Sequence, residues 1–124
     1  MTNTRSRQLA RKRGLRAEAL CALILRLQGY RILDRNWRVP VGEVDIIARR
    51  GKVLAFVEVK TRDTEDAAFE AVSLKQRQRI EKAVGAYLAM HPECANLHAR
   101  FDVMAVAPWR WPAHIQAAWG WTNV

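Results

Sequence analysis

The chain has 124 residues, half of them hydrophobic, which suits one domain of ordinary size with a substantial core. It contains 21 Lys and Arg residues against 12 Asp and Glu residues, so its formal net charge is +9. Such an excess favours a polyanionic partner, most often nucleic acid and less often an anionic membrane surface. No apolar run approaches the roughly 18 residues needed to cross a membrane, so we expect no membrane protein.

Cysteine and histidine usage argues against a disulfide scaffold or a zinc site. Cys21 and Cys94 are far apart, no CxxC motif occurs and no secretory signal is visible. A reducing, cytoplasmic setting is the simplest interpretation. The three histidines lack the spacing of zinc ligands, and we expect them at the surface or in loops.

Six basic residues precede the first acidic residue, Glu18. Residues 1–13 contain few apolar side chains, so we predict a disordered basic arm there and a single domain over residues 14–124. An arm of this kind would contact phosphate groups. Its candidate nucleic-acid ligands are Arg11, Lys12 and Arg13.

Apolar residues recur with helical spacing from Leu15 to Leu27, and Gly29 suits the position just beyond a helix end. The third of the strands that follow is apolar on both faces, which is typical of a central strand covered on both sides. A Pro-Val-Gly turn separates the first two strands, and a tight connection separates the second from the third. The three strands are predicted over residues 30–39, 44–48 and 53–59.

A second helix is predicted to begin after Ser73, because Ser73 and Gln76 have the spacing of a capping box, and Pro92 ends it. Residues 101–106 are predicted as a further strand, and residues 114–119 could add an edge strand. The order helix, three strands, helix, strand predicts an α/β fold in which helices flank a mixed β-sheet.

An acidic and a basic residue end one face of the third predicted strand. Because side chains alternate along a strand, Phe56, Glu58 and Lys60 share this face. Asp45 joins it if the preceding connection holds two or four residues, which would put Asp45 opposite Phe56, diagonal to Glu58, and Glu43 opposite Glu58. A three-residue connection would place the two carboxylates on opposite faces.

Several carboxylates on one partly buried face repel one another, so we expect a cation between them. Oxygen ligands of this kind suit Mg²⁺ or Mn²⁺, with Asp45, Glu58 and Glu18 as candidate ligands. Glu18 lies in a largely apolar helix and could face the same site, or it could stay solvated at the helix start. Lys60 could orient a water or stabilise a developing phosphate charge. Together these groups predict metal-assisted phosphodiester hydrolysis.

Several neighbouring residues keep two interpretations each. Gln76 could reach the site or serve only the capping box. Glu43 could be a further ligand or a hairpin cap, and Asp102 could be a site neighbour or a salt-bridge partner. The four C-terminal tryptophans could stack on bases, although packing is favoured. The remaining candidate phosphate contacts are Arg62, Lys75 and Arg77.

A series of motifs runs from about residue 14 to the end of the chain. They are Gly14-Leu-Arg-Ala-Glu18, Gly29-Tyr30, Asn36-Trp-Arg38, Gly42-Glu-Val-Asp-Ile-Ile-Ala48, Phe56-Val-Glu-Val-Lys-Thr-Arg62, Lys75-Gln76 and Arg100-Phe-Asp-Val103. Together these motifs resemble the YraN-like family of small bacterial proteins, which is similar to the archaeal Holliday-junction resolvases and to the PD-(D/E)xK nucleases. The resemblance implies a restriction-endonuclease-like core, with Glu18, Asp45, Glu58 and Lys60 in the acidic and lysine positions and Gln76 beside them.

We therefore predict a cytoplasmic Mg²⁺- or Mn²⁺-dependent endonuclease that acts on structured or branched DNA and could form a homodimer. Two alternatives stay open from the sequence. One is a nucleic-acid-binding protein that keeps the nuclease fold without efficient catalysis. The other is a basic interaction protein whose charge serves a protein or membrane partner.

Overall fold

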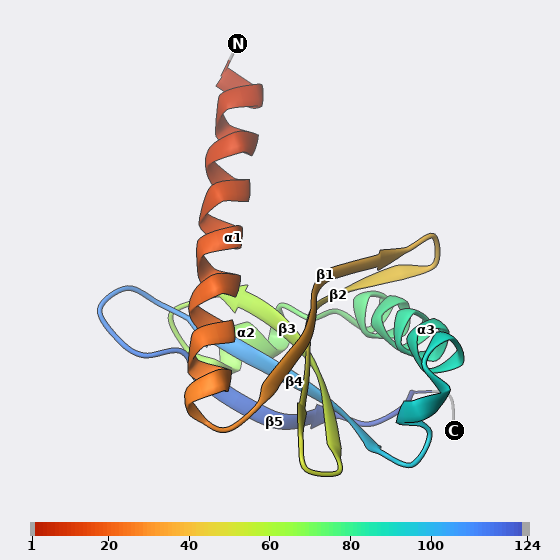
Figure 1. Ribbon diagram of the computed structural model, residues 1–124. Helices are drawn as coiled ribbons and strands as arrows, with labels where there is room; N and C mark the ends of the chain where they lie inside the picture. Colours follow the sequence, from red (N-terminus) through yellow and green to blue (C-terminus); the bar gives the residue numbers. More distant parts are fainter. Residues whose placement is uncertain (1, 123–124) are drawn as a thin grey trace.

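The computed structural model describes residues 2–122 and contains a twisted five-stranded sheet flanked by helices (Figure 1). Neighbouring strands follow chain order from β1 to β5, with β3 and β4 parallel and the other described pairs antiparallel. The predicted α/β fold with a mixed sheet is confirmed, and a short helix, α2, is an addition to it. The elements are α1 (Thr2–Leu27), β1 (Arg31–Val39), β2 (Gly42–Arg50), β3 (Val53–Thr61), α2 (Glu65–Glu70), α3 (Leu74–Met90), η1 (Pro92–Cys94), β4 (His98–Val106) and β5 (Ala113–Trp119).

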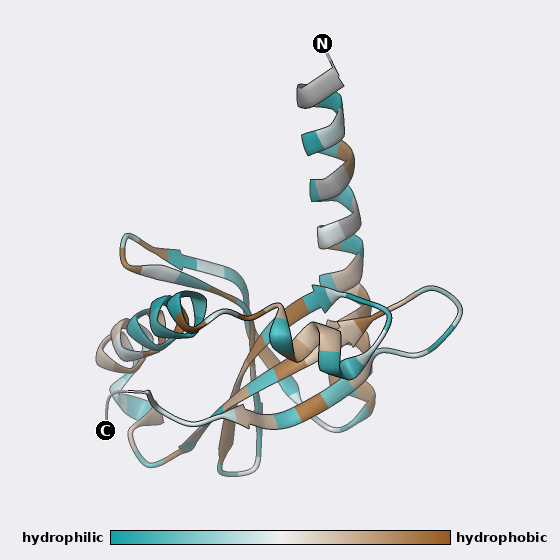
Figure 2. Ribbon diagram, turned by 180° about the vertical axis from the view of Figure 1, so that it is seen from behind, coloured by the Kyte–Doolittle hydropathy of each residue, from teal (hydrophilic) through white to brown (hydrophobic). Residues whose placement is uncertain are grey.

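Apolar clusters fill the space on both faces of the sheet. On one face, the C-terminal half of α1 packs its buried Cys21, Ala22 and Leu25 against alternate residues of β2 and β3. On the other, α3 packs Ile80, Val84 and Tyr87 against the opposite set. Figure 2 shows hydrophobic residues along the strands between these layers. Residues 54–58 of β3 are all buried, which confirms the predicted central strand.

The first helix is longer than the sequence suggested, because residues 2–13 are helical where we expected a disordered arm. Arg, Lys, Gln, Leu and Ala all favour helices, and neither Pro nor Gly interrupts the segment before Gly14. Figure 1 shows this part of α1 projecting away from the sheet. The side chains that are described before Gly14 are all exposed. No helix within residues 2–122 is long and apolar enough to span a membrane.

The connection between β2 and β3 has two residues, Gly51 and Lys52, between the paired Arg50 and Val53. Its even length matches the expectation, but the expected register was wrong by two positions, because Ile47 lies opposite Phe56. Gly51 has φ +60°, and glycine favours such a conformation in the first position of a two-residue hairpin turn. The turn therefore lies one residue further along the chain, which still leaves Asp45 and Glu58 on one face.

The ladder between β2 and β3 stops at the pair Ile46–Val57, although β1 and β2 stay paired as far as Val39–Gly42. Figure 1 shows the outer part of the β1–β2 hairpin bending away from β3 and crossing α3. Gly42 makes this crossing close, because a Cβ atom there would collide with the backbone carbonyl of Arg79. The sheet therefore forks between β2 and β3.

A buried charged cluster joins β4 to β5. The Asp102 carboxylate accepts two hydrogen bonds from Arg100, at 2.8 and 2.7 Å, and one from the backbone N–H of Ala117, at 3.0 Å. Nε2 of His114 lies 2.7 Å from the same carboxylate, and Arg100 also donates to the Tyr30 hydroxyl. Burial acts to raise the pKa of Asp102, but these hydrogen bonds outweigh it and hold the pKa below its usual value. Asp102 is thus a salt-bridge partner within the fold.

The substitution Asp102→Asn should lower the free energy of unfolding by about 3 kcal/mol, because it leaves the Arg100 guanidinium buried beside a neutral group. For a chain of this size the melting temperature should fall by roughly 10 °C. Thermal melts followed by circular dichroism provide the measurement, with the exposed Asp63→Asn as the matched control. Equal melting temperatures for the two variants would contradict the structural role of Asp102.

Candidate active site

Asp45 and Glu58 meet where the sheet forks. One step beyond the last ladder pair, Ile46–Val57, they stand beside each other and share a side-chain hydrogen bond. Oδ2 of Asp45 also accepts a hydrogen bond of 2.8 Å from the backbone N–H of Val59. The Asp45 side chain thereby takes the place of a ladder partner that the departing strand no longer provides.

The pair formed by Asp45 and Glu58 holds a proton at neutral pH. Burial, together with the hydrogen bond and the charge of Asp45, raises the pKa of Glu58 to about 10. Lys60, half-buried two residues further along β3, acts in the opposite direction and is outweighed. Two carboxyl groups in contact repel each other when both are ionised, so Glu58 keeps its proton beside Asp45.

Gln76 connects α3 to this pair. Its side-chain Nε2 donates a 2.7 Å hydrogen bond to Oε2 of Glu58, while its backbone N–H donates to the Ser73 hydroxyl at 3.1 Å. Gln76 therefore fills both roles that the sequence left open. Its backbone N–H takes part in the helix cap, and its side chain reaches Glu58. Ser73 is the N-cap of α3. By setting where the helix begins, it places the side chain of Gln76 toward Glu58.

Glu18 approaches the fork from α1. It is only 9% exposed, and its Oε1 atom is buried without a hydrogen-bond partner. Burial and the negative charge of Asp45 raise the pKa of Glu18 to about 7. The alternative of a solvated acid at a helix start is wrong, because α1 begins 16 residues earlier, at Thr2.

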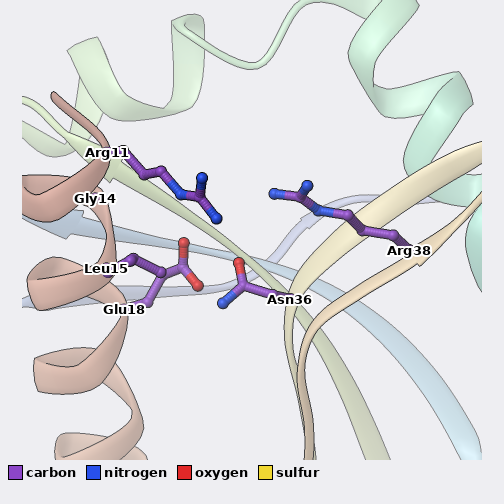
Figure 3. Close-up of a pocket in the computed structure, with 6 residues that line it drawn as sticks. All are labelled: Arg11, Gly14, Leu15, Glu18, Asn36 and Arg38. Carbon is purple, nitrogen blue, oxygen red and sulfur yellow. The ribbon is translucent and has the colours of Figure 1, made fainter. Parts of the chain in front are cut away.

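A cleft of about 420 Å³ lies beside Glu18, between α1 and β1. In Figure 3 the guanidinium groups of Arg11 and Arg38 point toward one another above the Glu18 carboxyl, and the Asn36 amide faces that carboxyl. Asn36 has φ 52°, a conformation that Asn adopts more readily than most residues. Sequence reasoning missed Asn36 and Arg38 as site residues, although their i, i+2 spacing on a predicted strand was an available signal.

The other predicted candidates lie at varying distance from the carboxyl groups. Glu43 forms a 3.1 Å salt bridge with Arg38, in which both side chains are largely exposed. The Arg77 guanidinium donates to the Val72 carbonyl and covers the Phe69 ring at 4.7 Å, so it packs within the fold. Lys12, Arg62 and Lys75 are exposed, and the Arg13 side chain lies outside the described residues.

The side chains offer the donor chemistry of a divalent-cation site. The carboxyl oxygens of Glu18, Asp45 and Glu58 are hard ligands, and the partnerless Oε1 of Glu18 lacks the hydrogen bond that a buried polar atom needs. A cation would also favour the ionised form of the Asp45–Glu58 pair. In the part of the chain that is described, however, no three His, Cys, Asp or Glu side chains stand close enough to hold a metal ion as they are.

The fold and this cluster define an α/β protein whose mixed sheet and flanking helices are consistent with a restriction-endonuclease-like core. Residues 17–106 match the model of "Uncharacterised protein family UPF0102", and the chain belongs to this family. The predicted family resemblance is thereby confirmed. The matched residues include Glu18, Asp45, Glu58, Lys60 and Gln76, whereas Arg11 precedes them.

Relatives in this family are similar over nearly the whole chain. The chain is 52% identical to a UPF0102 protein of Paramagnetospirillum magneticum over 120 residues, which cover 94% of this chain and 93% of the relative. It is 49% identical to one of Parvibaculum lavamentivorans over 106 residues, or 86% and 80% of the two chains. It is also 49% identical to one of Chelativorans sp. over 111 residues, or 90% of each.

The buried Glu58 predicts a pH-dependent stability for the protein without metal. A carboxyl whose folded pKa is about 10 stays protonated while the unfolded chain ionises near pH 4.5, so it lowers stability progressively above pH 4.5. Glu58→Gln should remove this effect. In EDTA its melting temperature should equal the wild-type value at pH 4.5 and exceed it by roughly 15 °C at pH 8, which corresponds to about 5 kcal/mol.

Melting temperatures of the two proteins between pH 4.5 and 9 provide this measurement. The exposed Glu70→Gln serves as the control, and its melting curve should follow the wild type at every pH. A constant difference between Glu58→Gln and the wild type across this range would show that Glu58 does not retain its proton in the fold.

Proposed function

We propose that the protein is a metal-dependent endonuclease that hydrolyses phosphodiester bonds in structured or branched DNA. The observation that carries this proposal is the meeting of Asp45 and Glu58 at the fork of the sheet, with Lys60 on the same strand and Glu18 on the facing helix. The neighbouring cleft sets cationic guanidinium groups beside the Glu18 carboxyl. Such a combination suits a substrate whose phosphate must be bound and hydrolysed at one place.

The cleft supplies binding through Arg11 and Arg38, whose guanidinium groups face each other and can hold the oxygens of one phosphate from two sides (Figure 3). Asn36 adds an amide that can donate a hydrogen bond to the same phosphate. Because Arg11 belongs to α1 and Arg38 to β1, a phosphate bound between them would also fix the helix relative to the forked strands.

Glu18, Asp45 and Glu58 would hold Mg²⁺ or Mn²⁺, which when bound supplies Lewis acidity and lowers the pKa of a water ligand. The backbone N–H of Val59 orients Asp45, and Gln76 orients Glu58, so both carboxyls are positioned before the substrate arrives. Lys60 orients the attacking water or stabilises the charge that develops on the phosphate.

Two observations favour a second candidate function, a DNA-binding protein without efficient catalysis. Glu58 keeps its proton at neutral pH, and no three acidic side chains among residues 2–122 enclose a cation as they stand. The buried, partnerless Oε1 of Glu18 weighs in favour of the nuclease. We place either activity in the cytoplasm, where the free, buried thiols of Cys21 and Cys94 would remain reduced.

Cleavage is tested on a Holliday junction, a flap, a blunt duplex, single-stranded DNA and RNA, each with Mg²⁺, with Mn²⁺ and with EDTA. Wild-type protein should cut a branched substrate only with metal. Asp45→Asn and Glu58→Gln should lose cleavage by about 10²-fold or more while they still bind DNA, since each removes a ligand charge. Lys60→Ala should lose a similar factor but keep metal binding.

Thermal melts with and without Mn²⁺ separate loss of metal from loss of structure. Mn²⁺ should stabilise the wild type and Lys60→Ala, but not Asp45→Asn or Glu58→Gln. The exposed Glu70→Gln should resemble the wild type in both assays. Full cleavage by a well-folded Glu58→Gln protein would rule out the proposed site, and cleavage of no substrate by the wild type would favour the binding protein.

Arg11 and Arg38 in the cleft predict how the affinity for DNA depends on salt concentration. Arg11→Ala and Arg38→Ala should each weaken binding to every DNA tested, and each should reduce the slope of log affinity against log salt by about 1. Lys52→Ala removes an exposed charge at the β2–β3 turn, beyond the opposite end of the β2–β3 ladder, and should leave the slope unchanged. If all three variants had the same slope, the cleft would not be a phosphate-binding site.

A further inference from the structure

The loop between β4 and β5, residues 107–112, exposes two tryptophans on either side of an arginine. Trp109 is fully exposed, at 103% of its reference area, and Trp111 is 75% exposed. By contrast, Trp119 is buried and stacks on Phe101 with the ring centroids 5.2 Å apart. The expectation of packing thus holds for Trp119 and fails for the two loop tryptophans.

The backbone holds these side chains away from the core. Trp109 has φ 65°, in the left-handed region that bulky residues rarely adopt. Pro108 precedes it, and the buried Pro112 anchors the loop after Trp111. Large aromatic side chains are seldom left in water by a folded protein, and strained backbone is concentrated at functional sites. A loop with both features is therefore a candidate contact surface.

This loop leaves β4 at the same end of the sheet as Lys60, which lies near the end of the parallel strand β3. In the parallel β3–β4 ladder Lys60 pairs with Ala105 and Thr61 with Val106, so residue 107 begins just beyond them. Ala107 and Pro108 line a groove together with Arg16 and Ala17 of α1. Figures 1 and 2 both show the loop extending past α1, the helix that carries Glu18.

We infer that Trp109 and Trp111 stack on unpaired bases of DNA that is bound at the proposed active site. The inference rests on the proposed function and defines its substrate class as duplex DNA with unstacked bases near the scissile phosphate. Aromatic side chains stack on any base, and the exposed Arg110 between them can contact the intervening phosphate. The loop lies beyond residues 17–106, which the family model matches.

Two other partners could use exposed tryptophans, a membrane interface and a second copy of the chain. The placement of the loop favours DNA over both. It begins at the end of the sheet where β3 carries Lys60, Arg16 of α1 lines the groove beside it, and Arg110 lies within it. Neither a lipid surface nor a second copy would account for a loop beside groups suited to phosphodiester hydrolysis.

Binding measured in EDTA separates base stacking from cleavage. The probes are a labelled fork with two single-stranded arms and a blunt duplex of the same length, followed by fluorescence anisotropy. The double variant W109A/W111A should bind the fork about tenfold more weakly than the wild type, and the blunt duplex less than about twofold more weakly. The control L27A/M90A removes two other exposed apolar side chains and should bind both as the wild type does.

Both double variants should melt as the wild type does, because the substituted side chains are exposed. Equal loss of affinity on the two probes, or no loss on either, would overturn the inference. So would tryptophan fluorescence that shifts to the blue with anionic phospholipid vesicles but not with the fork, or an oligomeric state that changes only in W109A/W111A. If the wild type cuts no substrate but the fork preference depends on the tryptophans, the nuclease proposal fails and the stacking contact stands.

Discussion

The hydrogen bond from the Val59 backbone N–H to the Asp45 carboxylate, 2.8 Å long, lies at the point where β2 leaves β3. Had the strands stayed paired, Asp45 and Glu58 would form an ordinary cross-strand pair, with neighbouring backbone closing the space around them. At the fork, the side chain of Asp45 instead supplies the hydrogen-bond acceptor that the Val59 backbone N–H would otherwise lack. Gly42 maintains the fork, since only a residue without Cβ lets the hairpin cross α3 so closely.

The fold treats two buried carboxyl groups in opposite ways. Asp102 is surrounded by hydrogen-bond donors, so its pKa is lowered and its charge contributes to stability. Glu58 is only slightly more exposed, yet its nearest ionisable neighbour is another carboxyl, so its pKa is raised and its burial opposes folding. A chain could avoid this cost with an apolar residue at position 58. A buried glutamate at position 58, close to Lys60 and Glu18, is the pattern expected of a functional site, where carboxyl groups with shifted pKa values are common.

Local patterns in the sequence predicted most of the fold but only part of the site. Strand alternation and an even-length connection were enough to place Asp45 and Glu58 on one face. The register itself escaped prediction because Gly51 could occupy either of two turn positions. Asn36 and Arg38 could not be joined to Glu18 from the sequence, since that contact depends on how α1 lies across β1, which tertiary packing decides. Gln76 was ambiguous because its backbone and its side chain make separate contacts.

The projecting half of α1 has a consequence for how the protein responds to its surroundings. Twelve residues at about 1.5 Å each extend roughly 18 Å, a length at which an isolated helix is only marginally stable in water. Arg7 and Arg11 lie one turn apart, as do Lys12 and Arg16, and like charges at this spacing repel. Any polyanion that neutralises them removes this repulsion and strengthens the helix. Helix stability in this segment would therefore be linked to polyanion binding, and a polyanion bound there would make the helix stiffer than in the free protein.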